Sequence, residues 1–269
     1  MILEIKGLNV FTKEKGKALL RDVTFSVKKN SCLGILGESG SGKSLTCKAL
    51  MGLLDENFHL EGDILFENSS LMDMNEKQKE KVRGKEICMI IQNPMSAFNP
   101  LFTLENQLLE TLRTHLAGDD TFLRALIVDA FGKMNLHHAT AILKKYPHQL
   151  SGGMLQRIMI ALCIALKPKV IIADEPTTAI DVVNQVEVIK ELKNVRELFK
   201  TTMIFVSHDL SILSQMCDEL IVMHQGCIIE RGCLEEIIFH AKEDVTKELI
   251  STRLKLIQTF RSCVEDEAC

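Results

Sequence analysis

The stretch that decides the fold is LGILGESGSGKS, residues 33–44. Its first part, Leu33–Leu36, is a compact apolar run that predicts a short buried strand. A glycine-rich turn follows, and the sequence after the turn predicts a helix over Lys43–Leu54. Strand, glycine loop and helix in this order are the layout of a phosphate-binding unit.

The turn fits the pattern GxxxxGK followed by Ser or Thr. Glycines let backbone N–H groups turn inward around phosphate oxygens, and the following helix N-terminus adds partial positive charge. Lys43 is expected to reach the β- and γ-phosphates of a nucleotide, and the Ser44 hydroxyl to ligate Mg²⁺. An ordinary glycine turn is the alternative reading, which the flanking strand and helix disfavour. The residues expected around the phosphates are Gly37, Glu38, Ser39, Gly40, Ser41, Gly42, Lys43 and Ser44.

A second stretch, VIIADE at residues 170–175, reads as an apolar strand that ends in two acids. A buried strand would deliver Asp174 to the Mg²⁺ shell, and Glu175 could then polarise the attacking water. Phosphoryl transfer needs this combination of a cation, an anchored phosphate and an oriented nucleophile. The alternative is a strand that merely ends in charged surface residues.

The rest of the chain places these motifs in an α/β core with a mostly parallel sheet. Short strands are predicted before residue 70, at Ile2–Ile5, Val23–Val27 and Ile64–Phe66. From about Asn93 to Leu150 helical spacing takes over, which indicates a helical insert. Strand signals precede this insert at Met89–Ile91 and return after it at Val170–Ala173, Met203–Val206 and Leu220–Met223.

Composition excludes several classes of protein. The 269 residues carry a formal net charge of −4 and a pI of about 6.1, which argues against a nucleic-acid binder. The sequence contains no run of about 18 apolar residues and no signal-peptide pattern, so we expect a soluble protein or one held at a membrane by partners. The nine cysteines contain no CxxC pair, which argues against a zinc site and indicates reduced thiols in the cytosol.

The segment LSGGMLQR, residues 150–157, lies shortly before VIIADEP and resembles the signature motif of ABC ATPases. The resemblance implies a P-loop NTPase core of the RecA type with a mostly parallel sheet, an N-terminal antiparallel β part and a helical ABC subdomain. In that family the signature binds the γ-phosphate of ATP held by the opposite subunit. Ser151, Gly152 and Gly153 are the positions that carry this role here. A glycine turn before a helix N-terminus is physically suited to bind an anion.

Four further positions match the family one at a time. Gln92 resembles the Q-loop glutamine, which senses Mg²⁺ and the nucleophilic water, and Asp181 resembles the D-loop aspartate at the dimer interface. His208 resembles the switch histidine that contacts the γ-phosphate. Phe11 matches the aromatic residue that stacks on adenine, and a strand residue packed in the core is its alternative role. The catalytic set implied by the resemblance is Glu175, His208 and Gln92, with Ser44, Gln92 and Asp174 around Mg²⁺.

The resemblance also implies a domain plan. Residues 1–92 and 159–235 correspond to the ATP-binding core, and residues 93–158 to the helical subdomain with the signature motif. Residues 236–269 correspond to a C-terminal helical tail.

Within the ABC ATPases the chain is most similar to the peptide/nickel/opine importer group. The similar segments are QNPMSAFNP at 92–100 and YPHQL at 146–150. Other segments look like the nickel-import and metallophore-metal import ATPases, among them residues 171–178 and 165–169. The implied function is ATP-driven import of nickel or a related, possibly chelated, transition metal. Import of di- or oligopeptides is the alternative.

The resemblance implies partners as well. They are a second, non-identical ABC ATPase subunit, two membrane permease subunits and, indirectly, an extracytoplasmic substrate-binding protein, with no nucleic acid. The protein would then sit peripherally on the cytoplasmic face of the cell membrane and use ATP and Mg²⁺. Two rival readings are a soluble ABC ATPase of translation or DNA repair and a regulator that does not hydrolyse ATP. The single motif set disfavours the first, and Glu175 with His208 disfavours the second.

Overall fold

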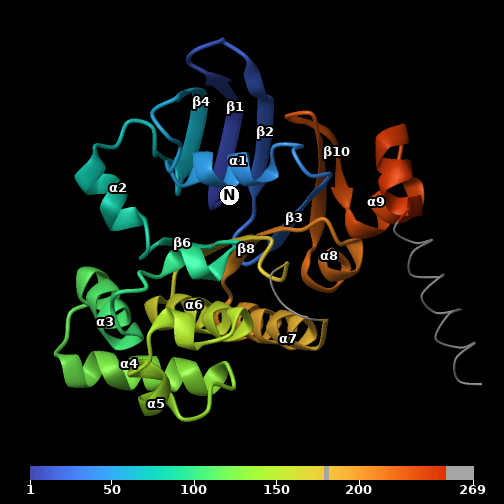
Figure 1. The fold of residues 1–269 in the computed structure, drawn as a ribbon. Helices are drawn as coiled ribbons and strands as arrows, with labels where there is room; N and C mark the ends of the chain where they lie inside the picture. The colour runs from blue at the N-terminus through green and yellow to red at the C-terminus, as the bar shows by residue number, and fades with distance from the viewer. Residues whose placement is uncertain (179–181, 253–269) are drawn as a thin grey trace, which may run out of the picture. The chain divides into compact units, whose positions relative to one another are not determined.

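The computed structural model describes residues 1–178 and 182–252, without the side chains of residues 182–184. The chain forms two compact units (Figure 1). The first, called the P-loop unit, comprises Met1–Val27, Cys32–Ser69 and the chain from Phe205 onward. The second, called the helical unit, comprises Lys28–Ser31 and Ser70–Ile204.

The P-loop unit begins with an antiparallel sheet in which β1 (Leu3–Thr12) lies between β2 (Ala18–Val27) and β4 (Phe58–Phe66). In β1 the buried residues change from odd to even numbers, because Leu3 and Ile5 are buried and so are Leu8 and Val10. The pairing shifts register between Ile5 and Leu8, so a β-bulge keeps both halves of the strand facing the core. The predicted N-terminal strands are confirmed, with longer bounds, and the two-residue strand β5 (Ser69–Ser70) follows them.

A second group of strands in this unit carries the glycine loop. Strand β3 (Cys32–Gly37) is buried along its whole length and pairs in parallel with β9 (Glu219–His224). Strand β10 (Cys227–Cys233), which the sequence did not predict, pairs antiparallel with β9. Helix α1 (Lys43–Leu50) follows the loop, and α8 (Leu210–Met216) and α9 (Leu234–His240) come later in the chain.

Helix α1 is shorter than predicted. It ends at Leu50 rather than Leu54, and Met51 is its C-cap, with an N–H directed at the Cys47 and Ala49 carbonyls. Gly52 then adopts φ 60°, a left-handed conformation that commonly terminates helices. The last residues of the predicted helix therefore form a turn.

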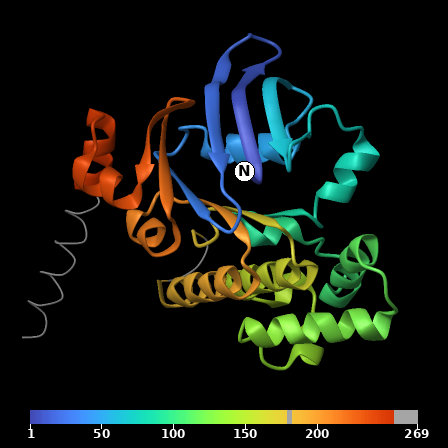
Figure 2. The ribbon, with the colours of Figure 1, turned by 180° about the vertical axis from the view of Figure 1, so that it is seen from behind.

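The helical unit contains two parallel strands and most of the helices. Strand β6 (Ile87–Ile90) pairs in parallel with β7 (Val170–Asp174), and β8 (Thr202–Val206) spans the division between the units. Helix α4 packs along α6, as both Figure 1 and Figure 2 show. The helices of this unit, in chain order, are α2 (Glu76–Val82), η1 (Pro94–Ala97), α3 (Leu104–His115), α4 (Asp120–Lys133), α5 (Ala139–Leu143), η2 (Pro147–Gln149), α6 (Gly152–Leu166) and α7 (Val182–Phe199).

The predicted helical insert is confirmed, and its apolar spacing marks the buried face. Leu123, Ile127 and Ala130 of α4 are buried as the 3.6-residue period requires, with Leu126 half-buried beside them. Helix α6 is buried over most of its length. Within the described residues no helix is both long and apolar enough to span a bilayer. The predicted α/β class with antiparallel N-terminal strands is therefore confirmed.

Candidate nucleotide-binding site

The loop between β3 and α1 has a backbone that only glycine accommodates easily. Gly40 and Gly42 have φ values of 79° and 106°, in the left-handed region. A Cβ atom on Gly37 would lie 2.4 Å from the Met223 carbonyl oxygen, and one on Gly42 would lie 2.6 Å from Leu20 Cδ2. The sequence Gly37–Ser44 thus folds into a tight turn that carries the chain into α1.

The side chains of this loop fit a phosphate group. Lys43 is 5% exposed, and its Nζ donates to the Gly37 and Glu38 carbonyl oxygens at 2.9 and 2.8 Å. The Ser41 hydroxyl is buried and has no hydrogen-bond partner among the described residues. A buried, unsatisfied hydroxyl and a lysine curled over backbone carbonyls are groups that a phosphate can engage. This geometry fits the phosphate-binding role predicted for the loop.

The acids at the end of β7 lie beside the residue that follows β6. Because β6 and β7 are parallel, with Ile90 paired to Ala173, the residues that follow them emerge at the same edge. There Gln92 Nε2 donates to Glu175 Oε2 at 3.2 Å. Asp174 is buried at the end of the strand. The structure therefore brings together two residues, Gln92 and Glu175, that the sequence separates by more than eighty positions.

Glu175 occupies an uncommon backbone conformation. Its φ is 45°, in the left-handed region where residues other than glycine are disfavoured. Its carbonyl oxygen accepts hydrogen bonds from the Thr178 hydroxyl at 2.9 Å and the Thr178 N–H at 3.3 Å. The turn after β7 is thus held by local hydrogen bonds while the Glu175 carboxylate receives Gln92.

The predicted signature segment forms the start of α6. Ser151 is the N-cap residue, and its hydroxyl accepts a hydrogen bond from the Met154 N–H at 3.3 Å. Gly152 and Gly153 occupy the first helical positions, and neither is buried. An accessible helix N-terminus of this kind carries partial positive charge and can bind an anion.

The remaining predicted residues occupy separate positions. His208 is half-buried directly after β8, and the Asp209 side chain caps α8 by accepting from the Ser211 N–H at 2.8 Å. Asp181 lies outside the described residues. By unit, the P-loop unit holds Phe11, the glycine loop and His208. The helical unit holds Gln92, the signature segment, Asp174 and Glu175.

Phe11 has an aromatic neighbour that the sequence did not reveal. It is half-buried near the end of β1 and stacks on His59 of β4, with ring centroids 6.4 Å apart and an interplanar angle of 28°. The two residues are direct partners in the strand register. That register depends on a pairing about fifty residues apart, so sequence spacing alone could not identify His59.

The chain resembles known proteins over most of its length. Residues 20–178 match the family model described as ABC transporter. The metal-staphylopine import system ATP-binding protein CntD of Staphylococcus aureus is 40% identical over 260 residues, which covers 97% of this chain and 96% of that protein. The oligopeptide transport ATP-binding protein OppD of Haemophilus influenzae is 39% identical, over 89% of this chain and 75% of that protein.

Solved structures share the fold. A dimeric ATP-binding cassette in a post-hydrolysis state, bound to ADP and Pi, superposes with a TM-score of 0.76 at 25% identity, covering 86% of this chain and 98% of that one. A subunit of the CbiONQ ABC transporter complex from Clostridium perfringens gives a TM-score of 0.75 at 26% identity, covering 97% and 98%. Together with the glycine loop, the acids of β7 and the signature segment, these similarities identify the chain as an ABC transporter ATPase, the ATP-binding subunit of an importer in the group that includes peptide and metal–staphylopine systems.

Proposed function

We propose that this ATPase drives the import of nickel or a related transition metal, carried free or bound to a small chelator. The observation that carries the proposal is the 40% identity, over nearly the whole of both chains, with a metal-staphylopine import ATPase. Import of di- or oligopeptides is the second candidate, and the 39% identity with an oligopeptide transport ATPase supports it. The ATPase does not touch the cargo, so both candidates share the chemistry that follows.

ATP binding and hydrolysis are proposed to use the residues that the sequence motifs name. Lys43 and the backbone amides of the loop hold the β- and γ-phosphates, and Phe11 stacks on the adenine. Ser44, Gln92 and Asp174 offer hydroxyl, amide and carboxylate oxygens, which are the donors that Mg²⁺ prefers. The bound ion would neutralise charge that develops on the phosphates.

Glu175 is the proposed general base for the attacking water. Its carboxylate accepts a hydrogen bond from the Gln92 amide, so the side chain that would offer its oxygen to the metal also orients the proposed base. His208 is proposed to contact the γ-phosphate. These roles need no group beyond the side chains that the fold supplies and the nucleotide with its metal.

The signature segment is proposed to act on a nucleotide held by a second ATPase subunit. Its glycine-led helix N-terminus is accessible, which suits contact with an external γ-phosphate. The dimeric cassette bound to ADP and Pi offers a precedent for such pairing. The second subunit is proposed to be a related but different chain, with Asp181 at the interface.

The permease is proposed to dock on the helical subdomain, residues 93–158, at the cytoplasmic face of the membrane. Met95, Leu101 and Phe102 expose 44%, 79% and 52% of their surface, so this short segment offers three large apolar side chains to a partner. The loop that carries Leu101 and Phe102 is fixed by Gln107, whose amide donates to the Asn99 and Phe102 carbonyl oxygens, both at 3.0 Å. A loop fixed in this way, with exposed apolar side chains, suits a cytoplasmic helix of a permease. In the same proposal, residues 1–92 and 159–235 form the ATP-binding core, and residues 236–269 form the C-terminal tail.

The deciding experiment measures total cell metal by elemental mass spectrometry, in cells with and without this protein under metal limitation. The expected result is a selective fall in nickel or cobalt without the protein, restored by the wild type but not by Glu175→Gln. The glutamine retains the phosphate contacts but cannot take a proton from water, so hydrolysis should fall by roughly 10²–10⁴-fold while ATP binding persists. Unchanged metals, with a loss of peptide uptake instead, would assign the cargo to peptides.

A further inference from the structure

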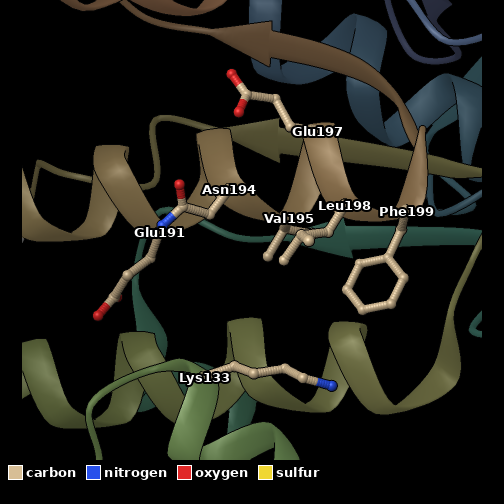
Figure 3. A pocket seen from close by; sticks show the side chains of 7 residues that line it. All are labelled: Lys133, Glu191, Asn194, Val195, Glu197, Leu198 and Phe199. Carbon is tan, nitrogen blue, oxygen red and sulfur yellow. The ribbon is translucent and has the colours of Figure 1, made fainter.

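Three helices of the helical unit meet at one buried carboxylate, that of Glu191 on α7. Glu191 is 4% exposed, whereas Glu197 on the same helix is exposed. Figure 3 shows the two side chains leaving α7 in opposite directions, with Glu191 directed toward the neighbouring helices. Ionised carboxylates are rarely buried to this degree unless other groups offset the loss of hydration.

Arg157 of α6 is the cation that offsets it. The Arg157 side chain is 13% exposed, and its Nε lies 3.9 Å from Glu191 Oε2. Its Nη2 donates to Glu187 Oε2, one helical turn before Glu191 on the same face of α7. One guanidinium thus donates a hydrogen bond to Glu187 and lies within ion-pair distance of Glu191, an arrangement that suits the broad, planar arginine head better than the compact ammonium of a lysine.

The third helix contributes an amide. Asn135, just past the end of α4, donates from Nδ2 to Glu191 Oε1 at 3.1 Å. Burial raises the pKa of Glu191, and the nearby Arg157 guanidinium and this amide oppose that effect. Asn135 itself has φ 51°, so the turn that brings its side chain to Glu191 uses the left-handed conformation that asparagine tolerates.

The other cation near Glu191 is engaged elsewhere. Glu191 and Lys133 both line a cavity of about 360 Å³ beside α7, whose apolar wall is formed by Val195, Leu198 and Phe199 (Figure 3). The Lys133 ammonium lies 2.6 Å from Asp129 and 5.4 Å from the centre of the Phe199 ring. The charge on Glu191 is therefore balanced chiefly from α6.

The two helices joined by Arg157 begin at functionally distinct points. Arg157 lies six residues beyond Ser151, or about 9 Å along the axis of α6. Glu187 lies five residues beyond the start of α7 at Val182, about 8 Å along that axis, and α7 is the helix that follows Asp174 and Glu175. Because helices are stiff over such lengths, fixing them at this crossing also fixes their N-termini.

We propose that Arg157 is a positioning residue for ATP hydrolysis. Its ion pairs with Glu187 and Glu191 hold the N-terminus of α6, which carries Ser151 and Gly153, in a fixed position relative to α7. The proposal rests on the proposed contact between the signature segment and the partner's nucleotide. Without these ion pairs the signature segment meets that nucleotide in variable positions, and turnover falls although the chain's own nucleotide still binds.

The test compares Arg157→Ala with wild type in the assembled transporter, reconstituted in lipid vesicles. The expected result is a fall in kcat of about tenfold or more, with KM and the Kd for ATP of the single subunit changed by less than about twofold. The kcat of Arg157→Lys should lie between those of Arg157→Ala and wild type, because an ammonium keeps the charge but does not span both carboxylates. Glu197→Gln, the exposed acid of the same helix, is the matched control and should behave as wild type.

Rescue separates positioning from general stability. Adding Glu191→Gln to Arg157→Ala removes the buried carboxylate that the lost guanidinium leaves uncompensated, so it should restore the folded fraction while kcat stays low. If Arg157→Ala does not fold, Glu187→Gln removes the exposed half of the pair and should still lower kcat about threefold with ATP affinity unchanged. Unchanged kcat in the folded single variants would overturn the proposal, and so would kcat and ATP affinity falling together with the folded fraction. ATP-dependent pairing of the wild-type subunits is measured in parallel, because its absence would refute the trans contact itself and not the role of Arg157.

Discussion

Two glycine-led helix N-termini in this molecule, those of α1 and α6, are built on different principles. At α1, Gly42 is the N-cap with φ 106°, and no side chain among the described residues caps the helix. At α6, Ser151 is the N-cap in extended conformation, and its hydroxyl caps the helix through Met154. Gly152 and Gly153 then have ordinary helical conformations.

The difference suits the α1 terminus to a phosphate held by its own subunit and, in the proposed function, the α6 terminus to a nucleotide held by a partner. In the loop before α1, glycines at positions 40 and 42 supply the left-handed backbone, and Lys43 is folded over the loop's own carbonyl groups. The start of α6 is capped by its own serine, so an incoming phosphate must compete with the Ser151 hydroxyl oxygen for the Met154 N–H. We therefore expect strong binding at the first site by the single subunit, and binding at the second only when a partner presents the nucleotide.

The largest expected effect is at the first site. Lys43→Ala should weaken ATP binding by the single subunit about a hundredfold, because charge-assisted hydrogen bonds to phosphates are each worth roughly 1.5–3 kcal/mol. Isothermal titration calorimetry measures the affinity, and Lys48→Ala, which removes an exposed lysine of the same helix, is the control. An unchanged Kd in Lys43→Ala would remove the distinction between the two helix N-termini.

The second site should fail in a different assay. Ser151→Arg places a bulky side chain at the start of α6 and should block ATP-dependent pairing, while the single subunit keeps its affinity for ATP. Size-exclusion chromatography with light scattering, in the presence of ATP and the partner subunit, follows the pairing. Thr121→Arg, at an exposed position in the first turn of α4, is the matched control. Intact pairing in Ser151→Arg would mean that the signature is not a trans contact.

Alanine at the two glycine positions should change stability in opposite directions. Gly42→Ala forces an L-residue into the left-handed region against Leu20 and should cost about 1–2 kcal/mol. Gly152→Ala occupies a helical position and should stabilise the free subunit by about 0.5–1 kcal/mol. Thermal unfolding by circular dichroism distinguishes them, at roughly 2–4 °C per kcal/mol for a chain of this size. If both variants changed the melting temperature by the same amount and in the same direction, the two helix N-termini would not differ as described.

The smallest effect concerns the cap itself. Ser151→Ala removes the hydroxyl that accepts from Met154 and should cost about 1 kcal/mol of unfolding free energy. Because the same hydroxyl is the proposed phosphate contact, the variant should also weaken ATP-dependent pairing, by less than Ser151→Arg does. Denaturant unfolding of the single subunit and titration of the pair measure the two losses separately.

The sequence predicted most of the fold because the decisive contacts are local. The strand, loop and helix around Gly37–Ser44 follow one another in the chain. The hydrogen bond between Gln92 and Glu175 is not local, because it depends on the parallel pairing of β6 and β7, more than eighty positions apart. Helix α2 escaped prediction because none of its residues is buried, so it has no apolar period; a capping box from Asn75 and Gln78 defines its start.

The other features that the sequence did not predict depend on the tertiary structure. Strand β10 lies at the edge of its sheet and contains no fully buried residue, which leaves a weak apolar pattern. The stacking of His59 on Phe11 requires the register of β1 and β4, and the Arg157 cluster requires the packing of three helices. These features depend on pairings between distant segments that no spacing in the sequence encodes.

The left-handed backbone of Glu175 means that folding and turnover make opposite demands on one position. A glycine or asparagine there would relieve roughly 1 kcal/mol of conformational strain, yet neither could fill the proposed role of general base. Selection for stability alone would therefore replace the glutamate at 175 and yield a more stable protein that no longer hydrolyses ATP. The glutamate at 175 is therefore explained by its proposed role in hydrolysis and not by the stability of the turn.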